Sequence, residues 1–376
     1  MCEWQLPDKI QRIVVKVGSR LVVKKCGGLN TEFIESLSHQ ILNSGVKNVA
    51  IVSSGAIAAG MGRMGIKTIP SSIPQKQALA AIGQSHLIRT YEKVFEKYGK
   101  KVAQILLTGD DLGIRNRFIN AVNTFDRLFS MGVIPIVNEN DTVTVEEIKF
   151  GDNDSLSAKV ALLIDADLLI ILTDVDGVYE KDPHRYSSTS IIKCIKGITK
   201  KEIEKFRTFQ PSKLGTGGIY TKLLAAYEAS LSSIPTIIAN GKKPDILIRI
   251  LNGEKDGTII LPRKKRMKSK KLWMALMSRP KGKIIIDEGA VKALLNGKSL
   301  LPSGIKKVEG VFSRGDTVVI ISDKGEEIGR GVTEYNSNEL AMIMGKRSSQ
   351  IQDILGYIFT DEVIHRDKMV LTYAVT

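Results

Sequence analysis

The chain has 376 residues, 43 % of them hydrophobic and 25 % charged, and a formal net charge of +15 at pH 7. This balance is typical of a globular protein of two or three domains and excludes a disordered or fibrous chain. No apolar run approaches the roughly 20 residues that span a membrane, and the first residues, MCEWQLPDKI, lack the basic and apolar segments of a signal peptide.

Cysteine and histidine are few and scattered. Cys2, Cys26 and Cys194 form no CxxC pair, which predicts a reducing compartment and neither a disulfide framework nor a zinc site. The four histidines are equally dispersed, so no histidine metal site is predicted. We therefore expect a cytoplasmic protein that is not bound to a membrane.

Residues 1–260 alternate between apolar runs and stretches of helical periodicity. The predicted strands are 12–18, 48–54, 102–107, 133–137, 167–173 and 235–239, and the predicted helices are 31–44, 75–98, 116–131, 155–164 and 219–232. Alternation of this kind predicts an α/β fold, with a mostly parallel open sheet and helices on both faces. Ligands of such sheets bind beyond the carboxyl ends of the strands, so we expect the binding residues in the loops that follow the strands.

Residues 261–281 separate this region from a different one. They contain nine basic residues and no acidic residue, with the run RKKRMKSKK at 263–271. Such a run predicts a solvated linker, with an anion or nucleic-acid contact as the alternative. Short strands and tight turns then predict a small, mostly β domain at 282–376, whose 12 basic and 13 acidic residues do not favour strong electrostatic binding of RNA.

Two common nucleotide-binding patterns are excluded. Gly60, Gly62 and Gly65 fit G-x-G-x-x-G, but they do not directly follow a strand and no acidic residue occurs between Gly65 and Glu92. The sequence GKS at 297–299 has Lys292 where a P-loop requires its first glycine.

Four other strand-end loops have the chemistry of an anion site. VVKVGSR places Lys16 inside an apolar run, where a lysine is costly to bury unless an anion meets it; a lysine whose amine reaches back to solvent is the alternative. VSSGAIAAG places Ser54 before small residues that suit a helix start. ILTDVDG ends a strand with Thr173 and Asp174. SKLGTGGIYTK at 212–222 resembles a phosphate-binding loop that is followed by Lys222.

Two polar clusters complete the set, NENDTVT at 138–144 and KFGDNDSLSA at 149–158. Either alone is explained by ordinary turn chemistry. Together with the basic loops, they predict Asp154 as the anchor that holds Lys16 and Lys222, and Asp141 and Asn153 as groups that can hold an ammonium. Phosphoryl transfer to a carboxylate needs no His or Cys nucleophile, because the carboxylate is ionised at neutral pH; it needs positioning and positive charge.

The motifs VVKVGS, SSGAIAAG, VNEND, GDND.LSA, LTD..G and GTGG..TK resemble, in order, those of the amino acid kinase family, and within it those of the glutamate 5-kinases. Residues 282–376 resemble the PUA domain that follows the kinase in many bacterial members. The resemblance implies an amino acid kinase domain at 1–260, a basic linker at 261–281 and a PUA-like domain at 282–376.

The resemblance also implies roles for single residues. Lys16, Asp154 and Lys222 are the implied catalytic residues, and Ser54, Asp141 and Asn153 the implied glutamate-binding residues. The implied ATP site comprises Lys16, Thr173, Asp174, Thr216, Gly217, Gly218, Ile219, Tyr220, Thr221 and Lys222, with no metal ligand from the protein. Tyr220 departs from the usual motif and could alter nucleotide contacts.

The implied reaction is the ATP- and Mg²⁺-dependent phosphorylation of the side-chain carboxylate of L-glutamate to L-glutamyl 5-phosphate, the first step of proline biosynthesis. The family also implies feedback inhibition by proline, a homo-oligomer, and glutamyl phosphate reductase as a partner. Two alternatives stay open at this point: another amino acid kinase, such as acetylglutamate kinase, or an RNA-binding PUA protein with a relic kinase domain.

Overall fold

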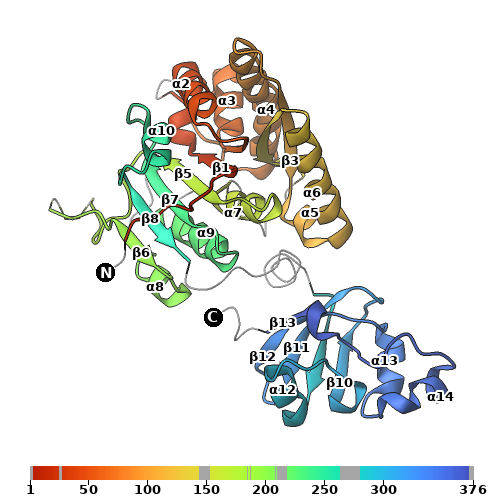
Figure 1. The fold of residues 1–376 in the computed structure, drawn as a ribbon. Helices are drawn as coiled ribbons and strands as arrows, with labels where there is room; N and C mark the ends of the chain where they lie inside the picture. Colours follow the sequence, from red (N-terminus) through yellow and green to blue (C-terminus); the bar gives the residue numbers. More distant parts are fainter. Residues whose placement is uncertain are drawn as a thin grey trace. The chain divides into compact units, whose positions relative to one another are not determined.

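The computed structural model describes residues 3–24, 28–143, 153–183, 185–186, 188–207, 209, 218–262 and 280–371. The basic run 263–271 and two predicted site residues, Thr216 and Gly217, lie outside these ranges. The chain forms two compact units, a larger one that ends near residue 266 and a smaller one that follows it (Figure 1).

The larger unit is built on one sheet. Its strands are Arg12–Val17 (β1), Asn48–Ser53 (β2), Val102–Leu107 (β3), Ile134–Glu139 (β4), Leu168–Thr173 (β5), Cys194–Lys196 (β6), Thr236–Asn240 (β7) and Thr258–Leu261 (β8). They pair in the order β3-β4-β2-β1-β5-β7-β8-β6, and among the described pairings only β7 with β8 is antiparallel. The predicted α/β class with a mostly parallel sheet is confirmed.

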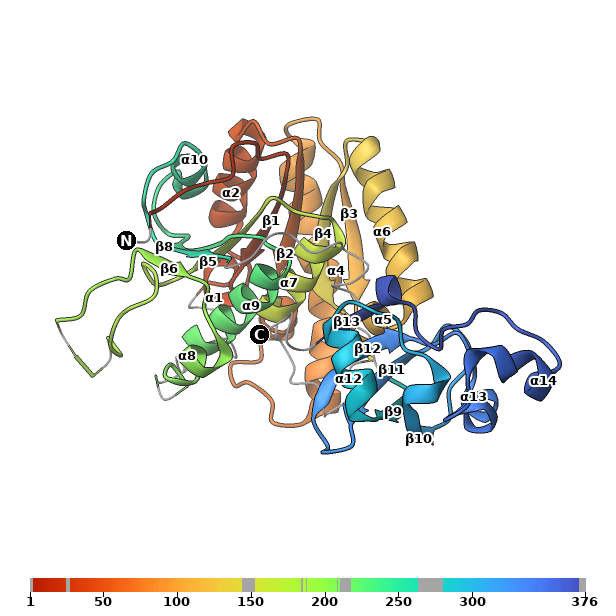
Figure 2. The same cartoon turned by 60° about the horizontal axis from the view of Figure 1, so that its bottom comes forward.

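Helices cover both faces of this sheet (Figures 1 and 2). They are Ser19–Val22 (α1), Thr31–Asn43 (α2), Ala56–Met64 (α3), Ile73–Glu96 (α4), Gly109–Gly113 (α5), Arg115–Ser130 (α6), Asn153–Leu163 (α7), Lys200–Glu204 (α8), Ile219–Leu231 (α9) and Ile246–Leu251 (α10). α2 packs against α4 and α10, and α7 packs against α9.

The alternation of side chains along β1 explains how one strand serves both faces. Val15 and Val17 join the hydrophobic core that also contains Leu37 of α2 and Leu87 of α4. Lys16 lies between them in the sequence, so its side chain points to the other face, where it reaches Asp154 of α7. An otherwise apolar run, Ile13 to Val17, therefore places one charged group on the side of α7 and α9.

Several short elements were not predicted. α1, α5, α8, α10, β6 and β8 have three to six residues each, too few for a periodic pattern to stand out. α3 holds Gly60 and Gly62, and Gly65 ends it in the left-handed conformation, so the G-x-G-x-x-G pattern lies in a helix, consistent with its exclusion as a dinucleotide fingerprint.

Cys194 differs from the sequence expectation, because it is disulfide-bonded. The sulfur is 3.6 Å from the carbonyl oxygen of Glu3, 191 residues away. The expectation of unpaired cysteines rested on spacing along the chain, and spacing does not reveal that the sheet brings β6 beside the N-terminal segment.

The smaller unit has its own sheet and core. Its strands are Gly282–Ile286 (β9), Ile305–Gly310 (β10), Thr317–Ser322 (β11), Glu327–Val332 (β12) and Met369–Leu371 (β13), in the order β10-β9-β11-β12-β13. Its α-helices are Glu288–Leu295 (α12), Ser337–Ile343 (α13) and Ile351–Leu355 (α14). The core includes Ile284, Ile320 and Ile328, so this unit buries apolar side chains from its own strands.

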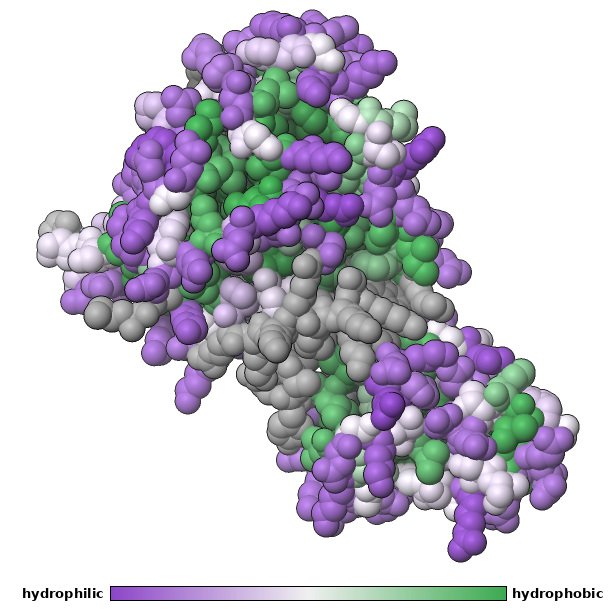
Figure 3. All heavy atoms as spheres, in the orientation of Figure 1, coloured by the Kyte–Doolittle hydropathy of each residue, from purple (hydrophilic) through white to green (hydrophobic). Residues whose placement is uncertain are grey.

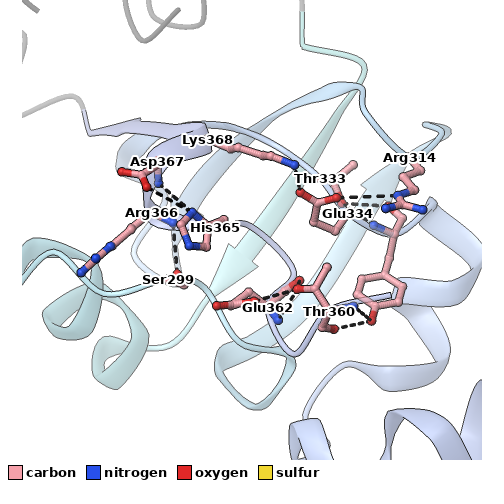
Figure 4. A network of polar contacts seen from close by, with 11 residues as sticks. Ser299, Arg314, Thr333, Glu334, Thr360, Glu362, His365, Arg366, Asp367 and Lys368 are labelled. Carbon is pink, nitrogen blue, oxygen red and sulfur yellow. Dashed lines mark hydrogen bonds and ion pairs between the residues drawn. The ribbon is translucent and has the colours of Figure 1, made fainter. Parts of the chain in front are cut away.

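A polar network lies on this smaller unit, around the nearly buried carboxylate of Glu334 (Figure 4). Lys368 forms an ion pair with Glu334, and Arg314 lies 3.6 Å from it. The Arg314 guanidinium also lies 3.9 Å from the centre of the Phe359 ring. Two cations therefore compensate one buried carboxylate, which accounts for their positions without a ligand.

No helix among the described residues is long and apolar enough to cross a membrane. On the visible face of each unit, hydrophilic residues surround areas of hydrophobic residues (Figure 3).

Candidate active site

The carboxyl ends of β1, β2, β4 and β5 meet at one edge of the sheet, because these strands run parallel as near neighbours. Backbone hydrogen bonds join the ends of three of them. Gly18 N–H donates to the carbonyl of Leu172 (3.1 Å), and Ser54 N–H donates to the carbonyl of Val17 (3.3 Å). The loops that the sequence singled out therefore do converge.

Lys16, Asp154 and Lys222 form one buried cluster. The side chains of these residues are 6 %, 2 % and 7 % exposed, respectively. Lys16 forms an ion pair with Oδ1 of Asp154, and Lys222 Nζ lies 3.2 Å from Oδ2. Thr221 Oγ1 also donates to Oδ2, at 2.8 Å. Strand β1, helix α7 and helix α9 each supply one member, so the cluster exists only in the folded chain.

Electrostatics favour an ionised Asp154. Burial alone would raise the pKa of its carboxyl group, but the charges of Lys16 and Lys222 and the hydrogen bonds from Lys16 and Thr221 outweigh burial and hold the pKa below its usual range. One carboxylate thus faces two lysines in a nearly dry place, where burial and the charge of Lys16 outweigh the charge of Asp154 and lower the pKa of the Lys222 ammonium. A buried positive charge of this kind attracts an anion.

A second group of polar side chains lies beside the cluster. Asn153 begins α7, directly before Asp154, and its Nδ2 donates to Ser54 Oγ at 3.1 Å. Oδ1 of Asn153 and Oδ1 of Asp141 are both buried, and neither accepts a hydrogen bond from the described part of the chain. Two buried acceptors without donors suit a ligand that brings its own N–H groups.

The environment of Asp141 is different from that of Asp154. Burial raises the pKa of the Asp141 carboxyl to about 6, because no described cation opposes the loss of solvent. A cationic ligand beside Asp141 would reverse this effect. The two aspartates thus have opposite environments, one already paired with cations and one available to receive a cation.

Arg20, a charged partner of Asp174, was not identified from the sequence. Arg20, in α1, donates through Nη1 to Oδ2 of Asp174 at 2.7 Å, and Thr173 Oγ1 lies 3.4 Å from Oδ1 of the same carboxylate. The available signal was a basic residue two positions after Gly18, at the end of the first strand. The partner of Arg20 is 154 residues away in sequence, which no local pattern reveals.

Helix α9 starts beside the buried cluster. Gly218 caps it without a side-chain hydrogen bond, and Ile219, Tyr220, Thr221 and Lys222 form its first turn. The Tyr220 hydroxyl donates to Glu204 Oε1 of α8 at 2.9 Å. The departure from the usual motif at Tyr220 therefore forms a contact between α8 and α9.

These features fit a polyphosphate substrate. Lys16 and Lys222 supply charge, and the amino-terminal end of the 13-residue helix α9 favours a phosphate. Among the described residues, no group of three or more His, Cys, Asp or Glu side chains could hold a metal ion. Mg²⁺ typically binds through substrate phosphates and one or two carboxylates, so this donor set is compatible with a Mg²⁺ ion that arrives with ATP.

The sequence profile of the amino acid kinase family matches residues 11–240. The chain belongs to the amino acid kinase family. The profile of the PUA domain matches residues 282–355. Both parts of the resemblance that the motifs indicated are confirmed, in the predicted order.

Relatives of nearly the same length indicate which members of the family this chain resembles. Glutamate 5-kinase of Geobacter sulfurreducens is 50 % identical over 367 residues, which cover 97 % of this chain and 98 % of that protein. Glutamate 5-kinase of a Thermoanaerobacter species is 49 % identical over 364 residues, with 96 % and 97 % coverage. That of Caldanaerobacter subterraneus is 49 % identical over 363 residues, also with 96 % and 97 % coverage. This family member is therefore a kinase that resembles glutamate 5-kinases from end to end.

Proposed function

We propose that this kinase phosphorylates the side-chain carboxylate of L-glutamate with ATP, giving L-glutamyl 5-phosphate in the first step of proline biosynthesis. The main support is the identity of about one half to glutamate 5-kinases over almost the whole chain. The geometry adds a buried pair of lysines beside a pair of unsatisfied acceptors.

In this proposal, the glutamate carboxylate attacks the γ-phosphorus of ATP, and the bond to the β–γ bridging oxygen breaks to release ADP. Lys16 and Lys222 stabilise the negative charge that develops on the transferred phosphoryl group and the leaving oxygen. Asp154 holds both lysines at fixed positions. Mg²⁺, when bound with ATP, supplies further positive charge to the phosphates.

The polar group beside the cluster binds glutamate. Asp141 and Asn153 direct their buried Oδ1 atoms at the substrate ammonium, and Ser54, which Asn153 contacts at 3.1 Å, completes the site. Acetylglutamate lacks the ammonium, so this arrangement favours glutamate over acetylglutamate. The nucleotide is assigned to Thr173, Asp174 and residues 216–222, of which Thr216 and Gly217 are assigned on the sequence motif alone.

Four further parts of the proposal rest on the family resemblance. They are inhibition by proline, a homo-oligomer, transfer of the product to a glutamyl phosphate reductase, and the division into a kinase domain (1–260), a linker (261–281) and a PUA-like domain (282–376). ATP and glutamate as substrates support a cytoplasmic location. RNA binding by the PUA-like domain is an alternative that its near-neutral charge does not favour.

The decisive experiment measures ADP release with Mg²⁺-ATP and one of four acceptors: glutamate, acetylglutamate, aspartate or UMP. We expect turnover with glutamate and at most weak turnover with the others. Comparable turnover with acetylglutamate would contradict the role of Asp141. Binding of RNA in a salt titration, with no turnover of any acceptor, would favour the RNA-binding alternative.

A further inference from the structure

Arg20 and Asp174 form an ion pair across the nucleotide end of the sheet. Arg20 lies in α1, just after β1, and Asp174 is the first residue after β5. The Nη1–Oδ2 distance is 2.7 Å, with side chains 30 % and 20 % exposed. A charge-assisted hydrogen bond in partial shelter from solvent is stronger than a neutral one at the surface.

The backbone around Asp174 explains why this contact matters. The carbonyl of Leu172 accepts from Gly18 N–H at 3.1 Å, and the carbonyl of Thr173 accepts from Gly241 N–H at 2.8 Å. These bonds fix β5 up to its last residue. Asp176, two residues beyond Asp174, is held by Asn240 at 3.1 Å and by Lys243 at 3.0 Å.

Asp174 lies between these two fixed points. Its side chain is held by Arg20, and burial, which alone would raise the pKa of its carboxyl, is outweighed by the hydrogen bond and charge of Arg20, so the pKa is lowered. Arg20 thus keeps the carboxylate ionised and oriented at the place where β5 leaves the sheet.

The Arg20 guanidinium has a donor without a partner among the described residues. Nε of Arg20 is buried and has no hydrogen-bond partner in the described ranges. A buried N–H donor is normally satisfied, and this one lies at the edge of the sheet that carries Lys16. The arrangement leaves a fixed positive group with spare donor capacity on the anion-binding side of the molecule.

We propose that Arg20 is a positioning residue for the nucleotide: by holding the Asp174 carboxylate in place, it sets the affinity for ATP and leaves the affinity for glutamate unchanged. The inference rests on the proposed function in one respect only, the assignment of Asp174 to the nucleotide site. Arg20 is not a catalytic residue in this account, because it acts through Asp174.

The same strand offers a matched control. Arg12 begins β1 at the opposite, amino end, and its Nη1 forms an ion pair with Asp126 at 3.0 Å, with the Arg12 side chain 35 % exposed. Arg12 Nη1 also donates to the carbonyl of Ile164 at 3.0 Å, and the guanidinium lies 5.8 Å from the centre of the Phe129 ring. Arg12→Gln therefore removes an ion pair together with these two contacts from the end of the sheet that is remote from the site. Any effect of Arg20→Gln that reflects only the loss of an ion pair should also appear in Arg12→Gln.

The experiment compares Arg20→Gln, Arg20→Lys, Arg12→Gln, Asp174→Asn and the double variant Arg20→Gln/Asp174→Asn. Two readouts are used on the full chain: calorimetric binding of a non-hydrolysable ATP analogue, and steady-state KM values for ATP and glutamate. We expect Arg20→Gln to weaken nucleotide binding and raise the KM for ATP by about tenfold or more, with a KM for glutamate close to that of the unmodified chain and a Tm no lower than that of Arg12→Gln.

The other variants separate positioning from general charge. Arg20→Lys should be intermediate, because it keeps the charge but not the planar geometry of the guanidinium. The double variant should be no worse than Asp174→Asn alone, because both changes remove one interaction. Nucleotide binding by Arg20→Gln equal to that of the unmodified chain would overturn the inference, and so would equal rises in both KM values or an equal effect of Arg12→Gln.

A wrong proposed function would give a different result from a wrong inference on Arg20. In that case the unmodified chain binds the ATP analogue but does not turn over glutamate, and the calorimetric comparison of Arg20→Gln with Arg12→Gln still decides the inference.

Discussion

Asp154 pairs with both Lys16 and Lys222, whereas each lysine pairs with Asp154. We therefore expect loss of a lysine and loss of the aspartate to have different effects. Lys222→Met removes one positive charge but leaves Lys16 paired with Asp154. We therefore expect it to retain most of its stability and to lose kcat by a factor that corresponds to about 3 kcal/mol, because the donor that we propose for the transition state is lost. The measurements are kcat, the KM for glutamate and urea unfolding.

Asp154→Asn is the contrasting variant. It leaves two lysines buried without a counter-charge, so we expect a loss of stability of roughly 3–5 kcal/mol together with the loss of activity. If Lys222→Met kept near-normal kcat, Lys222 would have no place in the mechanism. If both variants were equally destabilised, the cluster would have to be regarded as structural.

Asp141 gives a prediction on pH. Burial raises the pKa of its carboxyl to about 6, and in the proposed site only the ionised form attracts the substrate ammonium. We expect kcat/KM for glutamate to rise as the pH increases through about 6, since this parameter reports groups of the free enzyme. In Asp141→Asn, kcat/KM should be low throughout and should lack this step. A step of the same size in the variant would assign the titration to another group.

The same pKa makes a separate statement about stability. The folded-state pKa is raised above the ordinary value near 3.9, so the group stabilises the fold fully below about pH 4 and loses this contribution as the pH rises through about 6. Asp141→Asn should therefore gain stability relative to the unmodified chain at pH 8 but not at pH 4. Denaturant unfolding at the two pH values tests this. An equal difference at both would show that Asp141 is not buried as described.

The polar residues of the site were predictable to different degrees. Lys16 could be found because a lysine inside an apolar strand conflicts with its surroundings, and Lys222 because it follows a glycine-rich loop. Arg20 could not be found, since an exposed surface arginine and one that holds Asp174 look the same in sequence. The pairing of Ser54 with Asn153 also depends on the order of strands in the sheet, which the sequence did not provide.

Among the elements, helices α3 and α4 approach each other so closely that a single added methyl group tests their packing. A Cβ atom placed on Gly83 would lie 1.8 Å from the carbonyl oxygen of Ala56, and one placed on Gly60 would lie 2.0 Å from that of Leu79. Since α3 begins just after Ser54, this contact also supports the loop after β2. The two glycines let the backbones of α3 and α4 approach closely. Gly60, which belongs to the excluded G-x-G-x-x-G pattern, therefore has a packing role.

Gly83→Ala should force the two helices apart. We expect a loss of stability of about 1–3 kcal/mol, the usual cost of overpacking, and a higher KM for glutamate. Gly109→Ala in α5 is the control, because a Cβ there has no neighbour within 4 Å; it should be neutral or slightly stabilising. A Gly83→Ala variant as stable as Gly109→Ala would contradict the close approach.

Long elements were predictable because their apolar runs are continuous. β1, β2 and β5 were located to within one residue at each end, since buried parallel strands read as nearly unbroken apolar stretches. β4 extends two residues further than predicted, to Glu139. The extension contains Asn138, whose amide donates to Gln84 at 2.6 Å. A polar residue can thus remain in a buried strand when a helix supplies its partner.

On the scale of the whole molecule, the two units have separate cores. The core of the larger unit is formed by strands and helices up to Ile259, and that of the smaller unit by residues from Ile284 to Met369. The order of the two regions was predictable from the change in pattern near Lys283. The linker was predicted from its charge, but its residues lie outside the described ranges, so its boundaries stay a prediction.

Removal of residues 282–376 tests whether the second core is needed by the first. We expect a chain of residues 1–281 to fold and to form ADP in the presence of glutamate, because the cluster of Lys16, Asp154 and Lys222 and the residues around Asp141 all belong to the larger unit, and because a sheet covered by its own helices can bury its apolar faces alone. The assay is glutamate-dependent ADP release with and without proline, with circular dichroism as the check on folding.

The full chain carrying Glu334→Gln is the control, since it disturbs the polar network of the smaller unit (Figure 4) without removing that unit. An effect of proline that disappears only on truncation would assign the inhibition to the smaller unit. Folded protein without turnover would mean that the smaller unit completes the active enzyme, and the division into two functionally separate domains would be wrong.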